Sequence, residues 1–135
     1  MRTKSFRRAC PPLAILFALL LPLAACDSRS AGVPEWFPVY PGSEPELLSE
    51  RIEGDRRFGS FSFEADQPPG PVLVFYRDAL EKEGYEVRTT PFRRPDEVRG
   101  GQLTAKTADG AHGLHVTVDQ ADAGSSVVVS YSELM

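Results

Sequence analysis

The sequence predicts an α+β domain in which an antiparallel sheet of about five to six strands packs against a single helix. Three observations support this fold class. Apolar and polar residues alternate in several runs after residue 45, which is typical of strands with one buried face. Residues 69–84 have helical spacing instead, and turn residues separate the runs. The expected order is β-β-α-β-β-β-β.

Residues 33–45 come first and are rich in proline and aromatic residues, and Pro41–Gly42 suits a type II turn. Trp36, Phe37 and Tyr40 are expected to lie across the core as an N-terminal brace, because large aromatic side chains usually bury. The alternative is contact with a membrane interface, which suits the amphipathic ring of Trp36.

Residues 46–66 form two extended runs around Gly54–Asp55, a pair typical of a two-residue hairpin turn. In the second run small and apolar residues alternate with polar ones: Gly59, Phe61, Phe63 and Ala65 alternate with Ser60, Ser62 and Glu64. This strand is therefore expected to have one buried side.

The helix is predicted from residues 69–83. Its apolar positions recur at helical spacing: Val72, Phe75, Tyr76, Ala79 and Leu80. Pro71 suits a first helical turn. Gly84 is expected to be the left-handed residue that ends the helix, so that Tyr85 contacts Leu80 as in a Schellman motif.

Four strands are expected after the helix, at residues 85–92, 102–108, 114–120 and 125–133, with a loop at 93–101, a turn at 109–113 and a hairpin tip at 121–124. The loop concentrates Arg93, Arg94 and Arg99 in an otherwise acidic chain. It is either a solvated connection or a contact for anionic headgroups or an acidic partner, worth about 1 kcal/mol per basic residue near an anionic surface.

Residues 1–25 have the order of a secretory signal peptide. Arg2, Lys4, Arg7 and Arg8 precede an apolar run, and no acidic residue occurs before Asp27. The apolar stretch 9–25 has 17 residues and three prolines, whereas a helix that spans a bilayer needs about 20 apolar residues. A retained signal anchor is the alternative.

Leu23, Ala24, Ala25 and Cys26 close this segment and resemble the lipobox of bacterial lipoproteins. The resemblance implies diacylglycerol on the Cys26 thiol, cleavage before Cys26 and acylation of its new amino group. Two or three acyl chains give stable anchoring. Asp27 occupies the position that retains enterobacterial lipoproteins in the inner membrane, so the resemblance implies a periplasm-facing protein of the inner rather than the outer membrane.

The sequence therefore divides into a removed signal peptide (1–25), the lipidated cysteine with a tether (26–33) and a single α+β domain (34–135). Without residues 1–25, 11 Lys+Arg would face 19 Asp+Glu, a formal charge of −8. This charge argues against nucleic acid as a partner, because phosphate binding needs a basic surface. Cys10 would leave with the signal, so no intramolecular disulfide is expected.

A second resemblance joins "VYPGS" at 39–43 with "FYRDALEKEGYEV" at 75–87. These two pieces are similar to small envelope lipoproteins of unassigned activity that pair a Y-P-G entry with F-Y-x-x-x-L-x-x-x-G-aromatic. The resemblance implies no catalytic residues.

His112 and His115 are the candidates for chemistry, with Asp109 and Asp119 nearby in sequence. Residues three apart on a strand point to opposite faces, so the imidazoles converge only if Gly113 supplies a bulge or turn; both histidines are expected to face solvent. No nucleophile, phosphate-loop or metalloprotease motif occurs.

We therefore predict a non-enzymatic, lipid-anchored binding or adaptor module without a cofactor or metal, which engages an envelope protein, a glycan or a lipid. The alternative is a small hydrolytic or metal-dependent periplasmic enzyme that uses His112 and His115.

Overall fold

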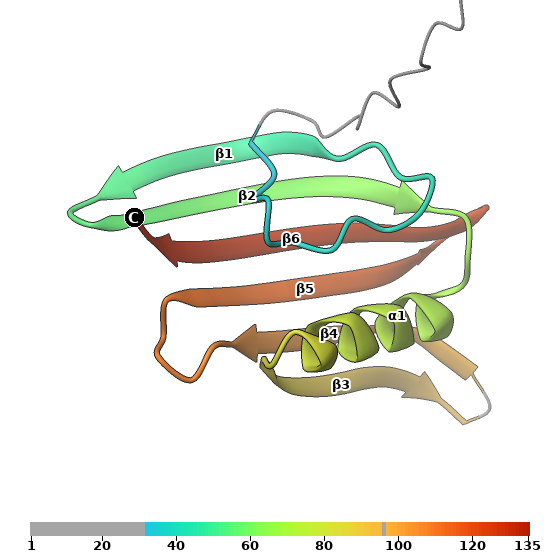
Figure 1. The fold of residues 1–135 in the computed structure, drawn as a ribbon. Coiled ribbons are helices and arrows are strands. Elements are labelled where there is room, and N and C mark those ends of the chain that lie inside the picture. The colour runs from blue at the N-terminus through green and yellow to red at the C-terminus, as the bar shows by residue number, and fades with distance from the viewer. Residues whose placement is uncertain (1–31, 96) are drawn as a thin grey trace, which may run out of the picture.

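The computed structural model describes residues 32–95 and 97–135, in which one antiparallel sheet carries a single helix on one face (Figure 1). The elements in chain order are β1 (Glu46–Glu53), β2 (Arg56–Ala65), α1 (Pro69–Lys82), β3 (Glu86–Arg94), β4 (Glu97–Lys106), β5 (His112–Ala121) and β6 (Gly124–Leu134). The predicted fold class and the order β-β-α-β-β-β-β are confirmed.

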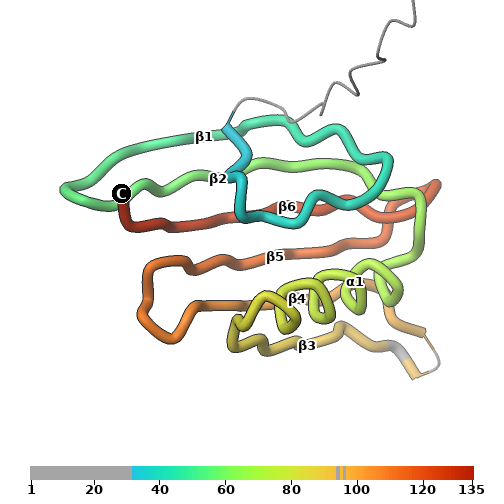
Figure 2. The backbone as a smooth tube through the Cα atoms, in the orientation of Figure 1, coloured from blue at the N-terminus to red at the C-terminus, as the bar shows by residue number. Residues whose placement is uncertain are grey.

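The six strands lie in the order β1-β2-β6-β5-β4-β3, and every neighbouring pair is antiparallel. The C-terminal strand β6 therefore lies between β2 and β5 and joins the N-terminal hairpin to the rest of the sheet (Figure 2). β1 and β3 form the two edges. The groove described below lies at the β3 edge.

The end of α1 has the hydrogen bonds that the sequence predicts. Gly84 has a φ of 88°, and its N–H donates to the carbonyl of Glu81 at 3.0 Å. The N–H of Tyr85 donates to the carbonyl of Leu80 at 3.0 Å. These two bonds define the Schellman motif. The chain therefore reverses at Gly84 and enters β3 beside the helix.

The prediction of a loop at residues 93–101 is wrong. β3 continues to Arg94, β4 begins at Glu97, and the two strands pair to their ends. The register shifts by one residue of β4 between Phe92 and Arg93, and the strands continue to pair beyond this shift. Pro91 is compatible with this strand because β3 is an edge strand, where a missing backbone donor can face solvent.

Residues 33–45 and α1 cover the same face of the sheet. The ring of Phe37 packs against Phe61 of β2 at 5.0 Å and against Tyr76 of α1 at 5.3 Å. Phe37 is 1% exposed and Tyr40 is 8% exposed, so the predicted N-terminal brace is confirmed for these two residues. Every strand, the helix and the brace lie within residues 32–135, so this fragment carries its own core.

The opposite face of the sheet, which we call the open face, is lined by small polar side chains. It includes Ser60, Ser62, Thr104, His115, Thr117 and Ser130, which alternate with buried residues along their strands. No element of the described residues covers this face. The sheet is thus apolar on one side and mostly polar on the other, where Val128 is also exposed.

Candidate functional site

Several of the predicted site residues lie outside the described residues. Cys26 and Asp27 precede residue 32, and the side chain of Arg94 is likewise outside what the structure describes. The lipid attachment and the sorting signal therefore remain predictions from the sequence.

The structure separates the other two arginines of the predicted basic loop. Phe92 pairs with Gly100 and Arg93 pairs with Val98, so Arg99 is the extra residue of β4 at the bulge. Arg99 forms an ion pair with Glu97 at 3.4 Å and lines a depression that also contains Asp119 and Asp122. Arg93 instead lines a groove beside α1. The arginines 93 and 99 therefore do not act as one patch.

The α1–β3 groove is the candidate site. It has a volume of about 360 Å³ and lies between the helix and the β3–β4 hairpin. Its lining residues are Gly70, Leu73, Val74, Arg77, Thr89, Pro91, Arg93 and Val98. Four of these are apolar, and two are arginines. Ligand sites commonly combine a mostly apolar wall with a few charged or polar groups in this way.

The local sequence of α1 explains why the groove is open. Leu73 packs into the core, whereas Val74 is 45% exposed beside it. Gly70 has no side chain, and a Cβ added there would meet no heavy atom within 4 Å. The first turn of the helix therefore leaves space above β3 that a larger residue would fill.

The pairing of β3 with β4 determines on which side of the sheet Arg93 lies. Thr89, Pro91 and Arg93 alternate along β3, and the bulge keeps Arg93 opposite Val98. Since both residues line the groove, the guanidinium and the apolar floor lie on the helix side of the sheet.

The groove is basic in an acidic chain. Arg77 pairs with the adjacent Asp78 at 2.9 Å, but both side chains are well exposed, so water screens this pair. Arg93 is exposed and forms no ion pair with the described residues. The first turn of α1 contains no acidic residue. The groove therefore offers positive charge to an incoming anion.

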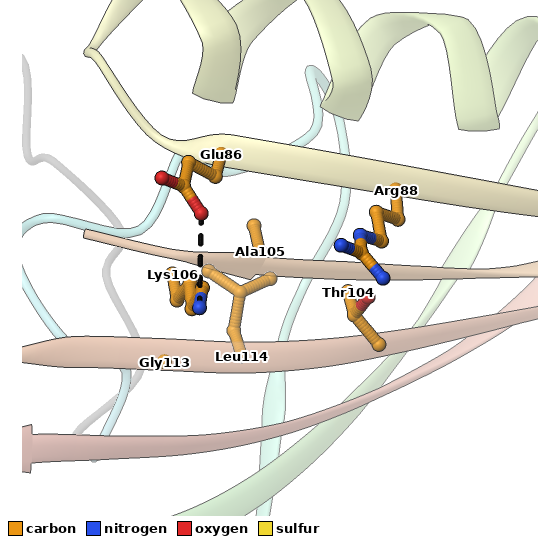
Figure 3. Close-up of a pocket in the computed structure, with 7 residues that line it drawn as sticks. All are labelled: Glu86, Arg88, Thr104, Ala105, Lys106, Gly113 and Leu114. Carbon is orange, nitrogen blue, oxygen red and sulfur yellow. Dashed lines mark ion pairs between the residues drawn. The ribbon is translucent and has the colours of Figure 1, made fainter. Parts of the chain in front are cut away.

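A second hollow, of about 410 Å³, lies over β3, β4 and β5 at the open face (Figure 3). Figure 3 shows Glu86 and Lys106 pointing toward each other, with Arg88 and Thr104 alongside. The carboxylate of Glu86 and the ammonium of Lys106 are 3.7 Å apart. Glu86 and Lys106 thus neutralise each other, while Arg88 is exposed and forms no ion pair with the described residues. The hollow has fewer apolar lining residues than the α1–β3 groove.

Trp36 belongs to an aromatic and polar cluster at the other end of the sheet. Its ring stacks on His112 with centroids 4.5 Å apart, and its Nε1–H donates to the carboxylate of Glu133 at 2.6 Å. The hydroxyl of Tyr85 lies 2.9 Å from Nδ1 of His112. Burial raises the pKa of the Tyr85 phenol above its ordinary value. The indole is therefore fixed by contacts within the domain.

The prediction that both histidines face solvent is correct for His115 and wrong for His112, which is half-buried under Trp36. His112 shares its face of β5 with Leu114, whereas His115 lies on the open face. Within the described residues, no three or more His, Cys, Asp or Glu side chains are placed to hold a metal ion. The two imidazoles therefore do not converge on one site.

In the part of the chain that the structure describes, no helix has the length and apolar character needed to cross a bilayer. No protein-family model, no curated protein and no solved structure matches the chain.

Proposed function

We propose that this protein is a lipid-anchored binding module of the cell envelope and that the α1–β3 groove is its binding site. The observation that carries the proposal is the groove itself, which combines an apolar floor with two arginines and is open to solvent. The resemblance of residues 23–26 to a lipobox supports the anchor.

The start of the domain indicates how the anchor would hold it. The hydroxyl of Tyr131 donates to the carbonyl of Gly32 at 3.1 Å, and Gly32 lies against the side chain of Leu47 in β1. Six peptide steps separate Cys26 from Gly32. Even fully extended, they would span at most about 22 Å. An acylated Cys26 would therefore hold the domain close to the membrane by its β1 side.

The groove lies at the opposite edge of the sheet. Five strand spacings separate β1 from β3, which corresponds to about 24 Å. The proposed arrangement thus turns α1 and β3 away from the membrane that holds the anchor. A ligand would reach the groove from the aqueous side.

The position of Asp27 supports retention in the inner membrane, with the domain in the periplasm. This part of the proposal depends on the lipoprotein resemblance and requires a cell with two membranes and the corresponding sorting machinery.

The anchor is tested by fatty-acid labelling and membrane fractionation of full-length protein. Cys26→Ser should abolish labelling and move the protein to soluble or unprocessed fractions, because the acceptor thiol is lost. Cys10→Ser is the matched control, since Cys10 would be removed with the signal, and it should leave both results unchanged. Labelling of Cys26→Ser at wild-type intensity would contradict the anchor.

Sorting is tested in the same cells by separating the two membranes by density. The wild-type protein should be found in the inner-membrane fraction, and Asp27→Ser should move protein to the outer-membrane fraction. A wild-type protein found mainly in the outer membrane would contradict the sorting proposal and leave the anchor intact.

A further inference from the structure

We infer that the α1–β3 groove binds a single-chain anionic amphiphile, such as a fatty acid or an alkyl phosphate, as a monomer. The inference rests on the proposed function of a binding module and adds the chemistry of its ligand. Neither the anchor nor its sorting is needed for the inference to be tested.

The floor of the groove fits a hydrocarbon chain. α1 and β3 run in opposite directions side by side (Figure 1), and Leu73 and Val74 of the helix line the groove together with Pro91 and Val98 of the hairpin. Val74 leaves much of its surface in water. An apolar chain that covers this strip removes apolar surface from water on both partners, which favours binding.

The charges of the groove fit an anionic headgroup. Because α1 and β3 are antiparallel, Arg93 lies toward the Gly70 end of the groove and Arg77 toward the other end. A guanidinium donates paired hydrogen bonds to a carboxylate or a phosphate. Arg93 forms no ion pair with the described residues, so it is available to bind the headgroup while the chain lies over Leu73 and Val74.

A monomeric amphiphile fits better than a bilayer surface. The proposed anchor holds the domain by β1, at the opposite edge from the groove. The mature chain would also carry a formal charge of −8, which opposes close approach to an anionic membrane. A bilayer could contact the groove only if a second membrane faced it or if the domain rotated. A free amphiphile requires neither.

The test uses residues 32–135, because this fragment contains the whole sheet, helix and core. Dodecanoate and dodecyl phosphate are titrated below their micelle concentrations and followed by amide chemical shifts. We expect saturable binding at one site, with the largest shifts at Gly70, Val74 and Val98. Octanoate should bind at least tenfold more weakly, because each methylene that loses its contact weakens binding by up to about fourfold.

Two further ligands separate the contributions of head and chain. Dodecanol has the chain without the charge, and inorganic phosphate has the charge without the chain. Both should bind at least tenfold more weakly than dodecyl phosphate. Equal binding of dodecanol would overturn the role of the arginines, and equal binding of inorganic phosphate would overturn the role of the apolar floor.

Three variants locate the site. Arg93→Gln should weaken dodecanoate binding by about fivefold, as expected for an exposed ion pair. Gly70→Leu should reduce binding by at least tenfold, because residue 70 lines the groove and no heavy atom lies within 4 Å of an added Cβ, so the larger side chain would compete with a ligand for this space. Arg88→Gln is the matched control, since Arg88 lies on the same strand but lines the hollow of the open face, and it should bind as wild type.

Thermal unfolding of each variant shows whether it is folded, which matters most for Gly70→Leu because residue 70 precedes Pro71, where a Cβ disfavours the helical conformation. Wild-type affinity in a folded Gly70→Leu would overturn the inference. Equal losses in Arg88→Gln and Arg93→Gln would overturn it as well. Binding to anionic phospholipid vesicles without binding to monomeric dodecanoate would replace the amphiphile with a membrane surface. None of these results depends on acylation of Cys26.

Discussion

Trp36 shows how a single side chain fastens the N-terminal segment to the sheet. Its indole stacks on His112 and donates to Glu133, whose carboxylate also forms an ion pair with Arg57 at 3.1 Å. A hydrogen bond to a charged acceptor in a partly buried site is stronger than a bond between neutral groups. The Trp36–Glu133 bond is therefore expected to contribute measurably to stability.

We predict that Trp36→Phe lowers the free energy of unfolding of residues 32–135 by about 1.5–3 kcal/mol, because it keeps an aromatic ring but removes the donor. Urea unfolding followed by circular dichroism measures this change. His115→Ala on the open face is the control and should stay within about 0.5 kcal/mol of wild type. An unchanged stability of Trp36→Phe would mean that the bond to Glu133 does not contribute.

At the residue scale, the sequence predicts burial better than it predicts partners. Phe37 and Tyr40 are buried as expected, because large aromatics seldom stay in water. The position of His112 was missed, since its neighbour Trp36 comes from a distant segment. Trp36 and its acceptor Glu133 are 97 positions apart. Periodicity describes one element at a time and does not show which distant side chains meet.

At the element scale, the end of α1 is the best-determined local feature. Gly84 has φ of 88°, which a β-branched residue strongly disfavours. A Cβ at this position would meet no heavy atom within 4 Å, so only the backbone conformation restricts the residue. Gly70 differs, because its φ is not positive and its restriction comes from Pro71, which disfavours the helical conformation for a preceding residue that has a Cβ.

We predict that Gly84→Val lowers the free energy of unfolding by roughly 1 kcal/mol or more, measured by urea or thermal unfolding. Gly84→Asn is the matched control, since asparagine adopts the left-handed conformation more readily than valine, and it should lose less stability than Gly84→Val. If both variants had the same stability, the left-handed conformation of Gly84 would not limit the fold.

The β3–β4 hairpin shows where residue composition fails to predict secondary structure. Residues 93–101 contain Arg, Pro, Asp and two glycines, which is typical of a loop, yet they extend two paired strands. The edge position of β3 tolerates Pro91, Pro95 lies in the turn between the two strands, and the bulge absorbs Arg99. This error also hid the groove, because Arg93 and Val98 line it only when both strands continue. The exposed Val74, an apolar residue beside Arg77 on the solvent side of α1, was the remaining sequence signal.

At the scale of the whole molecule, the position of β6 determines the architecture. Val127 and Val129 are fully buried because β6 pairs with β2 on one side and β5 on the other. Alternation predicts that β6 has a buried face, but every antiparallel order of the strands satisfies the same pattern. The fold class was therefore predictable, and the strand order was not.

The strand order also decides where a ligand can bind. α1 packs mainly over β4 and β3, while Phe37 and the rest of residues 33–45 cover β2 and its neighbours. The groove lies at the outer side of α1, at the edge farthest from β1. We therefore expect the β1 edge to lie nearer the membrane than the groove.

The most direct test of this account is the depth of two probes on the acylated protein in vesicles. Ile52 on β1 is 58% exposed, and Val74 on α1 is a comparably exposed position in the groove, at 45%. Ile52→Cys and Val74→Cys each introduce one thiol, because the mature chain would otherwise have only the acylated Cys26. A fluorophore on each thiol is then exposed to lipids that carry a quencher on their headgroups. We predict stronger quenching at residue 52 than at residue 74, whereas equal quenching, or stronger quenching at residue 74, would contradict the proposed orientation.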